Sequence, residues 1–221
     1  MQSPAIISWA FFLEKKMDVF ELFPTPIAHI KSVFDDGELN QIKDLALSKA
    51  NTPNKNSSNL FHSSPADKDA KKLLAITKPK LRQIIIDFGE LLLGDVLEWK
   101  IKEIWSNVSE KGGHQHVHNH ANSFISGIIY ISKAHESSRT VFHRQIGHNT
   151  FTFTHASETS VVNQFNAELW TIPTAESGDV LLFPSYLYHE VPTNKGTTRI
   201  SVAFNAIPRE IRSHDYSVCL E

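Results

Sequence analysis

Cysteine is almost absent from this chain of 221 residues, because Cys219 is the only one. A single cysteine excludes an internal disulfide framework and a zinc site built from several cysteines, and it fits a reducing compartment. Long apolar runs are missing as well. The longest near the start, residues 5–13, is interrupted by Ser8 and is well short of the roughly 20 residues that span a bilayer. We therefore expect a cytoplasmic protein without a membrane span.

The sequence also lacks an excess of either charge. The formal net charge is −2 and the isoelectric point about 6.6, so a strongly basic nucleic-acid footprint is absent and we expect no extensive nucleic-acid binding. Apolar residues make up 41% and charged residues 21% of the chain, both ordinary for a globular protein. The length suits one compact domain.

The first sixteen residues differ from a secretory signal, because the charges Glu14, Lys15 and Lys16 follow the apolar stretch instead of preceding it. We interpret residues 1–16 as an N-terminal extension, with a helix packed on the body as the alternative. Residues 17–221 are then a single domain.

The first half of this domain has helical spacing. After an apolar strand entry at about 17–32, the apolar positions predict helices over about 38–49 and 66–93, with Pro79 as a kink or break in the second. The Asn-, Ser- and Pro-rich stretch 51–64 is typical of a loop.

From about residue 97 the pattern changes to short runs rich in β-branched and aromatic residues, separated by turn residues. So many closely spaced strands predict a mainly β fold with packing helices, either a sandwich or a jelly-roll barrel with helices over one face. Residues 17–96 would be the helical support region and 97–206 the jelly-roll core. The candidate strands are 98–108, 114–120, 123–132, 139–143, 150–154, 168–172, 179–183, 187–192 and 197–206.

Histidine, in contrast, is abundant: there are 12, and His114, His116, His118 and His120 alternate within seven residues. On an extended strand all four would face one side, with neighbours roughly 6.5–7 Å apart. Two adjacent imidazoles at this spacing can bind one ion, and a third ligand must then come from elsewhere. A solvated polar strand or an adventitious metal patch is the alternative interpretation.

A second constellation lies near the C-terminal end. A turn at Gly178-Asp179 precedes a buried strand, after which His189 follows, and then Arg199 and Ser201 on one face of an alternating strand. A distant histidine can complete a three-ligand metal site, and a guanidinium binds carboxylates in a two-pronged fork. The two constellations together predict a metal and an acid ligand.

These residues resemble the iron- and 2-oxoglutarate-dependent oxygenase superfamily, and more narrowly a bacterial and phage branch with a His-x-His…His pattern. The resemblance spans about 20–206. The pieces that carry it are Leu22-Phe23-Pro24-Thr25-Pro26-Ile27, Trp105-Ser106-Asn107-Val108, His118 to Tyr130 (HNHANSFISGIIY), Gly178 to His189, and Arg199 to Asn205 (RISVAFN).

The resemblance implies a double-stranded β-helix, that is, a cupin-like jelly-roll barrel, and an Fe(II)/2-oxoglutarate-dependent dioxygenase that couples decarboxylation of 2-oxoglutarate to oxidation of a substrate. By position it implies His118, His120 and His189 as metal ligands and catalytic residues. It also implies that Arg199 and Ser201 bind 2-oxoglutarate, with Tyr130 and Asn107 as further contacts. The pair 116/118 is the alternative register.

One departure from the wider superfamily concerns charge. His-x-Asp or His-x-Glu is usual there, whereas this chain has His-x-His, so its site is less negative by one charge and could prefer zinc to iron. A three-histidine metalloenzyme that does not use 2-oxoglutarate, and a non-catalytic metal- or ligand-binding barrel, are the alternative functions. The substrate stays open, whether a small molecule or a peptide. His135, His143, Arg144 and His148 could face the mouth, and an exposed edge strand could support a homodimer.

Overall fold

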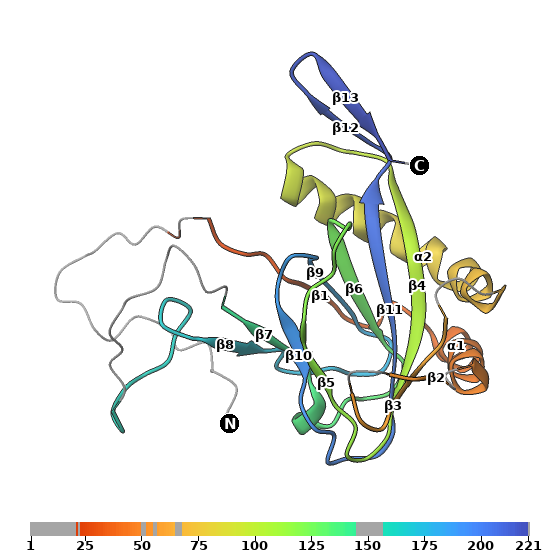
Figure 1. Ribbon diagram of the computed structural model, residues 1–221, viewed down its shortest axis with the longest axis vertical. Helices are drawn as coiled ribbons and strands as arrows, with labels where there is room; N and C mark the ends of the chain where they lie inside the picture. Colours follow the sequence, from red (N-terminus) through yellow and green to blue (C-terminus); the bar gives the residue numbers. More distant parts are fainter. Residues whose placement is uncertain are drawn as a thin grey trace.

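The computed structural model describes residues 21, 23–49, 52–54, 57–64, 68–144 and 157–220. The expected extension 1–16, the candidate strand 150–154 and His148 lie outside these residues. The part that is described folds into two helices and two facing β-sheets, with a separate hairpin near the C-terminal end (Figure 1). The mainly β architecture with packing helices is therefore confirmed.

Helix α1 (Asp36–Lys49) begins with a reciprocal cap. Asp35 Oδ1 accepts from the backbone N–H of Glu38 at 2.9 Å, and Glu38 Oε2 accepts from the N–H of Asp35 at 3.0 Å. These two bonds satisfy backbone donors that the first turn of a helix leaves unpaired.

Helix α2 (Lys68–Leu93) ends at Gly94, which has a φ of 72° and donates to the carbonyl of Glu90 at 2.8 Å. Of the kink or break expected at Pro79, the break does not occur, because Pro79 lies inside α2. Proline removes one helical hydrogen bond, and the burial of Leu81, Ile85 and other side chains of the same helix offsets that loss. Neither helix has both the length and the apolar character needed to cross a membrane.

The larger sheet has seven strands in the order β1-β9-β6-β11-β4-β3-β2. Its long central strand β11 pairs antiparallel with β4 on one side and β6 on the other, and every residue of β11 is buried. The strands are β1 (Ala28–Ile30), β2 (Thr52–Pro53), β3 (Leu60–His62), β4 (Trp99–Ser109), β6 (Ile125–Tyr130), β9 (Val180–Pro184) and β11 (Arg199–Pro208).

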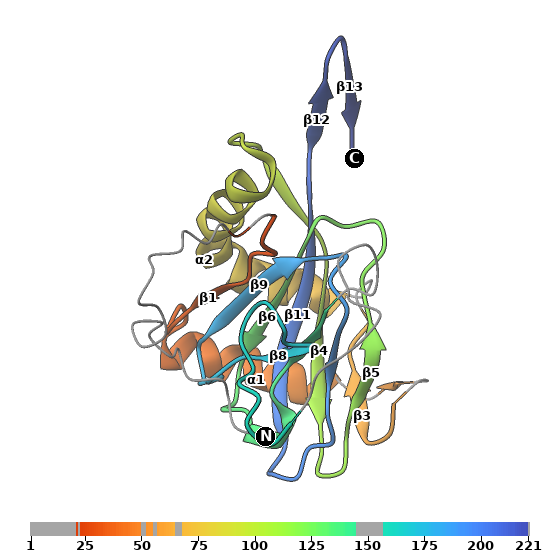
Figure 2. The ribbon, with the colours of Figure 1, turned by 90° about the vertical axis from the view of Figure 1, so that its left-hand side faces the viewer.

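The smaller sheet has four strands in the order β5-β10-β7-β8 and lies on the side of the larger sheet that faces away from the helices (Figures 1 and 2). Its strands are β5 (Gln115–His118), β7 (Val141–His143), β8 (Leu169–Thr171) and β10 (His189–Val191). Two facing antiparallel sheets are the jelly-roll arrangement that the strand pattern predicts.

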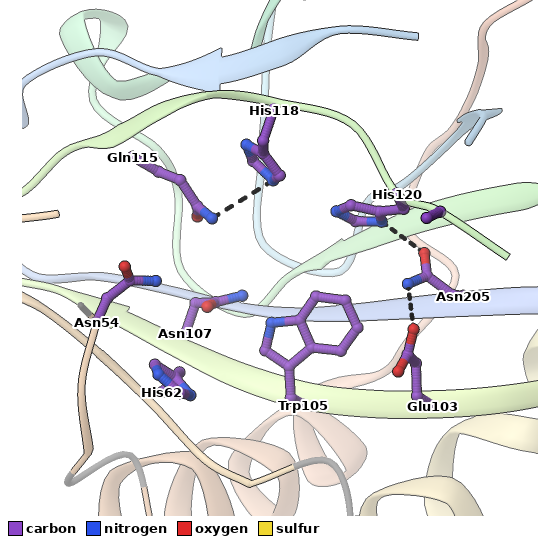
Figure 3. Close-up of a pocket in the computed structure, with 10 residues that line it drawn as sticks. Asn54, His62, Glu103, Trp105, Asn107, Gln115, His118, His120 and Asn205 are labelled. Atoms are coloured by element: carbon purple, nitrogen blue, oxygen red, sulfur yellow. Dashed lines mark hydrogen bonds between the residues drawn. The ribbon is translucent and has the colours of Figure 1, made fainter. Parts of the chain in front are cut away.

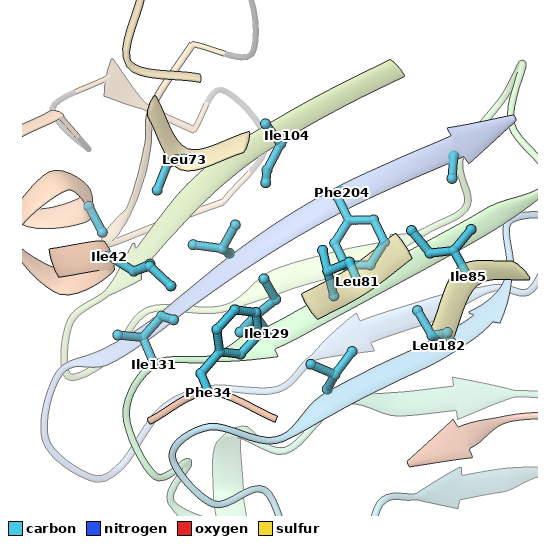
Figure 4. Close-up of a cluster of buried hydrophobic side chains, with 14 of the residues drawn as sticks. Phe34, Ile42, Leu73, Leu81, Ile85, Ile104, Ile129, Ile131, Leu182 and Phe204 are labelled. Carbon is cyan, nitrogen blue, oxygen red and sulfur yellow. The ribbon is translucent and has the colours of Figure 1, made fainter. Parts of the chain in front are cut away.

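Alternation along β11 assigns its side chains to two different layers. Ile200, Val202, Phe204 and Ala206 belong to the core between the larger sheet and the helices (Figure 4). The intervening residues, among them Arg199 and Ser201, face the smaller sheet, because successive side chains of a strand point to opposite sides. A second apolar cluster, which includes Tyr130, Phe142 and Phe183, fills part of the space between the sheets.

Two features of the strand assignment differ from the expectation. The stretch 51–64, expected as a loop, contains β2 and β3, and β3 pairs with the end of β4. The hairpin of β12 (Glu210–Ser213) and β13 (Tyr216–Cys219), which was not expected, extends away from both sheets. The Asn-, Ser- and Pro-rich composition of 51–64 and the mostly polar residues of β12 and β13 do not show the apolar, β-branched pattern by which the other strands were predicted.

Candidate functional site

Three imidazoles converge between the two sheets. One ring nitrogen from each of His118, His120 and His189 lies within 4.8 Å of the others. His118 ends β5, His120 follows two residues later outside the strand, and His189 begins β10, where it pairs directly with His118. The ring centroids of His118 and His189 are 4.3 Å apart. The structure thus brings together the three residues that the resemblance implies as ligands.

A bulge in β5 separates these histidines from the outer two. His189 pairs with His118 but Val191 pairs with Gln115, so β5 has one residue more than β10 over this span. The extra residue reverses the alternation, and Gln115 and His118 therefore both line the cavity.

The expectation that four histidines share one face of a strand 114–120 is consequently wrong. The strand covers only 115–118. His114 and His116 contact each other instead, with their Nε2 atoms 3.4 Å apart, and neither lines the cavity.

The loop after β9 positions two of the three rings. Leu187 N–H donates to the carbonyl of Pro184, which closes the turn that leads into His189. The carbonyl of Ser185 in this turn accepts from the backbone N–H of His120 at 2.9 Å. One short turn therefore both delivers His189 and holds the backbone of His120.

Each of the three rings is held through its Nδ1 atom by an oxygen. His118 Nδ1 donates to the carbonyl of His116 at 2.8 Å, and His189 Nδ1 donates to the carbonyl of Leu187 at 3.0 Å. His120 Nδ1 donates to Asn205 Oδ1 at 2.6 Å. Because these oxygens accept, the proton of each neutral ring is on Nδ1, and Nε2 keeps a lone pair for a metal.

Burial favours the neutral form of all three rings. It lowers the pKa of His118 and of His120. It also lowers the pKa of His189 to about 3, with the neighbouring His118 as a further cause. Metal binding requires neutral imidazole, so the three donors are in the form that binds at neutral pH.

This donor set fits a divalent transition metal. Nitrogens bound to one ion at about 2.1 Å lie roughly 3 Å apart, so the rings need only small adjustments. Gln115 Nε2 donates to His118 Nε2 at 3.4 Å, and an ion would replace this long hydrogen bond. Three protein ligands leave coordination positions for other molecules, as in catalytic sites.

Two of the three rings, His118 and His120, border a cavity of about 340 Å³ (Figure 3). Its floor is formed by alternate residues of β4, with the indole of Trp105 lying against His120 at a centroid distance of 5.7 Å. Apart from Ala121, the remaining lining is polar. It consists of Asn54, His62, Glu103, Asn107, Gln115, Ala121 and Asn205 together with His118 and His120.

Arg199 is a buried cation, 4% exposed, at the start of β11. Its Nη1 donates to Ser201 Oγ at 2.9 Å, and its guanidinium carbon lies 5.3 Å from the centre of the Tyr130 ring. Within the described residues Arg199 forms no ion pair, and its Nε has no hydrogen-bond partner. A buried guanidinium is costly unless a carboxylate or a similar anion pairs with it, so this arrangement fits an acid ligand.

Ser109, the residue opposite Arg199, also has a buried polar atom without a hydrogen-bond partner among the described residues. Ser109 pairs with Arg199 across β4 and β11, and the buried atom is its Oγ. Asn107 pairs with Ser201 in the same register and lines the cavity. The unpaired polar atoms of Arg199 and Ser109 therefore lie two residues along their strands from the pair Ser201 and Asn107, and Asn107 lines the cavity beside His118 and His120.

Tyr130, the other expected contact, is fully buried and its hydroxyl is shared with Thr140 Oγ1 at 2.9 Å. Burial raises the pKa of Tyr130, so it stays a neutral donor. It contacts Arg199 through its ring face, an arrangement that favours a cation.

Sequence reasoning assigned no role to several residues of this site, chiefly Asn205, Glu103 and Ser109. Asn205 could have been found, because it is on the same alternating face of β11 as Arg199 and Ser201. Glu103 and Ser109 could not, since their position depends on how β4 pairs with β11.

His135, His143 and Arg144, which were expected as candidates to face the mouth of the barrel, have other contacts. His135 hydrogen-bonds Ser137, and His143 Nε2 lies 3.2 Å from Glu190 Oε1. Arg144 donates to the carbonyl of Phe165. None of these three lines the cavity.

Comparison with protein families identifies the central part of the chain. Residues 103–205, just under half of the sequence, match the model of the family described as "Putative 2OG-Fe(II) oxygenase". This confirms the resemblance stated from the motifs. By sequence, no curated protein matches the chain.

Solved structures of similar fold include the following three. A 2OG-Fe(II) oxygenase family oxidoreductase from Burkholderia pseudomallei has a TM-score of 0.57 and 15% identity, covering 81% of this chain and 83% of its own. HygX from Streptomyces hygroscopicus, with nickel and 2-oxoglutarate bound, has a TM-score of 0.58 and 17% identity, and the alignment covers 83% of each chain. SnoK, an alpha-ketoglutarate-dependent carbocyclase of nogalamycin biosynthesis, has a TM-score of 0.59 and 11% identity, and the alignment covers 84% of this chain and 81% of SnoK. At these identities the similarity establishes the jelly-roll fold.

Proposed function

Residues 103–205 match the model of the family described as "Putative 2OG-Fe(II) oxygenase", and from that match we propose that the chain is such an oxygenase, that its three-histidine centre holds the iron and that Arg199 selects 2-oxoglutarate. The observation that carries the proposal is the buried guanidinium of Arg199, which has no carboxylate partner among the residues that the structure describes and is on the same face of β11 as Asn205, which holds a histidine of the centre. Metal donors and an acid-binding group thus belong to one surface between the sheets.

The metal would be held by Nε2 of His118, His120 and His189. Their Nδ1 hydrogen bonds fix the orientation of each ring, and such bonds also make the ligand nitrogen more basic. All three ligands are neutral, so the bound ion keeps its full positive charge for the acid cosubstrate.

Arg199 and Ser201 would hold the distal carboxylate of 2-oxoglutarate. The Nη1–Ser201 bond and the Tyr130 ring fix the guanidinium before the ligand arrives, which reduces the ordering cost of binding. Asn107, and Ser109 by its unpaired hydroxyl, would complete the polar wall of this cradle.

Apolar side chains keep water from one side of the centre. Phe183 lies against His189 with ring centroids 4.7 Å apart, and Phe142 lies 6.0 Å from the same ring. With iron and 2-oxoglutarate bound, the centre would supply the oxidative decarboxylation of the oxoacid by O2 to succinate and CO2, with the second oxygen atom used to oxidise a substrate. The protein itself binds and orients the metal and the oxoacid, and it excludes water from the centre.

The test is turnover of labelled 2-oxoglutarate to succinate by protein supplied with Fe(II), ascorbate and oxygen. We expect slow substrate-free turnover, lost in His189→Ala and Arg199→Met. Absence of both succinate and oxoacid binding in the wild-type protein would refute the proposal.

Metal analysis and oxoacid titration distinguish the other functions of a three-histidine site. Bound metal with no affinity for 2-oxoglutarate, and no effect of Arg199→Met, would indicate a metalloenzyme with a different cosubstrate. Tight metal binding without oxygen consumption under any substrate screen would indicate a binding protein.

We further propose a small molecule or a peptide side chain as substrate, admitted through the polar cavity of Figure 3, and a cytoplasmic location. The proposed domain is 17–221, with 97–206 as its jelly-roll core. A homodimer through an exposed sheet edge is part of the same proposal, and sedimentation of the full chain tests it.

A further inference from the structure

Behind His120 lies a chain of two short hydrogen bonds that ends in a carboxylate. His120 Nδ1 donates to Asn205 Oδ1 at 2.6 Å, and Asn205 Nδ2 donates to Glu103 Oε1 at 2.7 Å. The two side chains face each other because Asn205 and Glu103 are register partners on β11 and β4. Figure 3 shows both bonds on the His120 side of the cavity.

His120 is supported differently from the other two rings. His118 and His189 donate to backbone carbonyls, which are neutral. Only the His120 ring is connected, through one amide, to a charged group. Ser126 Oγ also donates to Asn205 Oδ1, at 2.7 Å, so the amide has three partners and a single orientation.

The backbone is shaped for this contact. The β4–β11 ladder is regular from Arg199 to Asn205 and then slips, since Asn205 pairs with Glu103 but Ala206 pairs with Ile101. The extra residue is Lys102, so β4 has a bulge next to Glu103. Bulges redirect side chains and occur often beside functional sites.

The negative charge of Glu103 gives this chain of hydrogen bonds a way to affect the metal site. A His-x-His centre lacks the anionic ligand of a 2-His-1-carboxylate site. A carboxylate that ends a hydrogen-bonded chain polarises the amide and the imidazole toward the metal, and such outer groups commonly change metal affinity 10- to 100-fold.

Resting on the proposed metal-binding function, we propose that Glu103 is a positioning residue of the metal centre: acting through Asn205, it orients His120 and supplies the negative charge that the three-histidine ligand set lacks. Lys102 Nζ lies 3.5 Å from the same Glu103 oxygen. Both side chains are partly exposed, so solvent weakens this ion pair and the shorter Asn205 bond is the specific contact.

The experiment measures binding of Co(II) alone to metal-free protein, by visible absorption and by competition with a chelator. Glu103→Gln keeps a hydrogen-bond acceptor for Asn205 and removes the charge, and we expect about tenfold weaker binding. Asn205→Leu breaks the chain, and we expect a loss toward 100-fold with an altered cobalt spectrum. Glu90→Gln, an exposed glutamate of α2, is the matched control and should bind like the wild type.

The double variant Glu103→Gln/Asn205→Leu tests whether Glu103 acts through Asn205. Binding equal to that of Asn205→Leu alone supports the chain, whereas independent, additive losses overturn it. Thermal unfolding of the metal-free variants checks that they fold. If Glu103→Gln is the only one of these variants that folds, its Co(II) affinity relative to that of Glu90→Gln decides whether the Glu103 charge supports the metal centre.

The outcomes separate this proposal from the function on which it rests. Wild-type affinity in Glu103→Gln, with cobalt and 2-oxoglutarate still bound, refutes the role of Glu103 and leaves the proposed function intact. Failure of the wild-type protein to bind cobalt at all refutes both.

Discussion

At the scale of single residues, the candidate site contains buried polar groups whose burial lowers the stability of the fold. His189 is held neutral among aromatic rings, and Arg199 is charged, buried and without an ion pair among the described residues. A buried unpaired charge destabilises a fold by several kcal/mol. Such a cost is typical of groups retained for binding.

The first prediction concerns Arg199. Replacing it with Met, which has a similar shape and no charge, should weaken 2-oxoglutarate binding about 100-fold, because charge-assisted bonds to the carboxylate are lost. The same change should raise the stability of the ligand-free protein by about 1 kcal/mol or more, since the buried charge is removed. Calorimetric titration and chemical unfolding measure the two effects.

The exposed Arg82→Met on α2 is the control for this variant and should change neither quantity. Unchanged oxoacid affinity in Arg199→Met would mean that another group binds the carboxylate.

The second prediction follows from the pKa of His189, about 3 in the folded chain against 6.5 when unfolded. A folded pKa below the unfolded one means that the unfolded chain binds more protons, so stability is lost as the pH falls below 6.5 toward 3. For metal-free protein His189 alone should cost about 2 kcal/mol between pH 7 and pH 5. Urea unfolding at the two pH values measures it.

His189→Gln, which does not titrate, should reduce this pH dependence by the same amount. His118 and His120 change stability in the same direction, because burial lowers their pKa values too. A wild-type slope equal to that of His189→Gln would contradict the assignment.

At the scale of elements, α2 shows packing prevailing over local preference. Its apolar side chains cover the outer face of the larger sheet, and the helix continues through Pro79 in spite of the missing N–H. The bulges in β5 and β4 are the opposite case. There a local irregularity in a strand determines which side chains reach the site.

The third prediction is that Pro79→Ala stabilises the protein by about 1–3 kcal/mol, because alanine restores a helical hydrogen bond and has the best helix propensity. Pro79 is exposed, so the substitution should leave metal and oxoacid affinity unchanged. Thermal unfolding measures the gain, and a lower melting temperature would show that the proline is needed for the shape of α2.

At the scale of the whole molecule, the site belongs to neither sheet alone. His118 and His189 come from the smaller sheet, whereas Arg199 and the groups that support His120 come from the larger one. Ligands that bind between the sheets should therefore stabilise their association.

The fourth prediction is that nickel at 100 times its dissociation constant stabilises the protein by about 2.7 kcal/mol, which corresponds to a rise in melting temperature of roughly 5–11 °C for a chain of this size. 2-Oxoglutarate should add to the shift only when metal is present. Scanning fluorimetry with and without a chelator measures this. An oxoacid shift that does not depend on metal would place the acid elsewhere.

The fold class, and the three histidines that the structure brings together, could be predicted from the sequence, because their signals are local. Alternating apolar residues indicated the long strands, and a distal His189 with Arg199 and Ser201 indicated a metal and an acid ligand. The strands β2 and β3 were not predicted, because the stretch 51–64 is rich in Asn, Ser and Pro and β3 pairs with the distant strand β4. The hairpin of β12 and β13 was not predicted either, because its residues are mostly polar. The continuation of α2 through Pro79 depended on packing.

What the sequence by itself determined is therefore the set of chemical groups: neutral nitrogen donors, a guanidinium with a hydroxyl two residues later, and β-strands on which to display them. The tertiary structure decided which of those groups meet. A one-residue bulge turned His118 inward and left His114 and His116 outside, and the pairing of β4 with β11 joined Glu103 and Asn205 to His120. Register between distant strands decides these contacts, because a shift of one residue exchanges the faces of a strand.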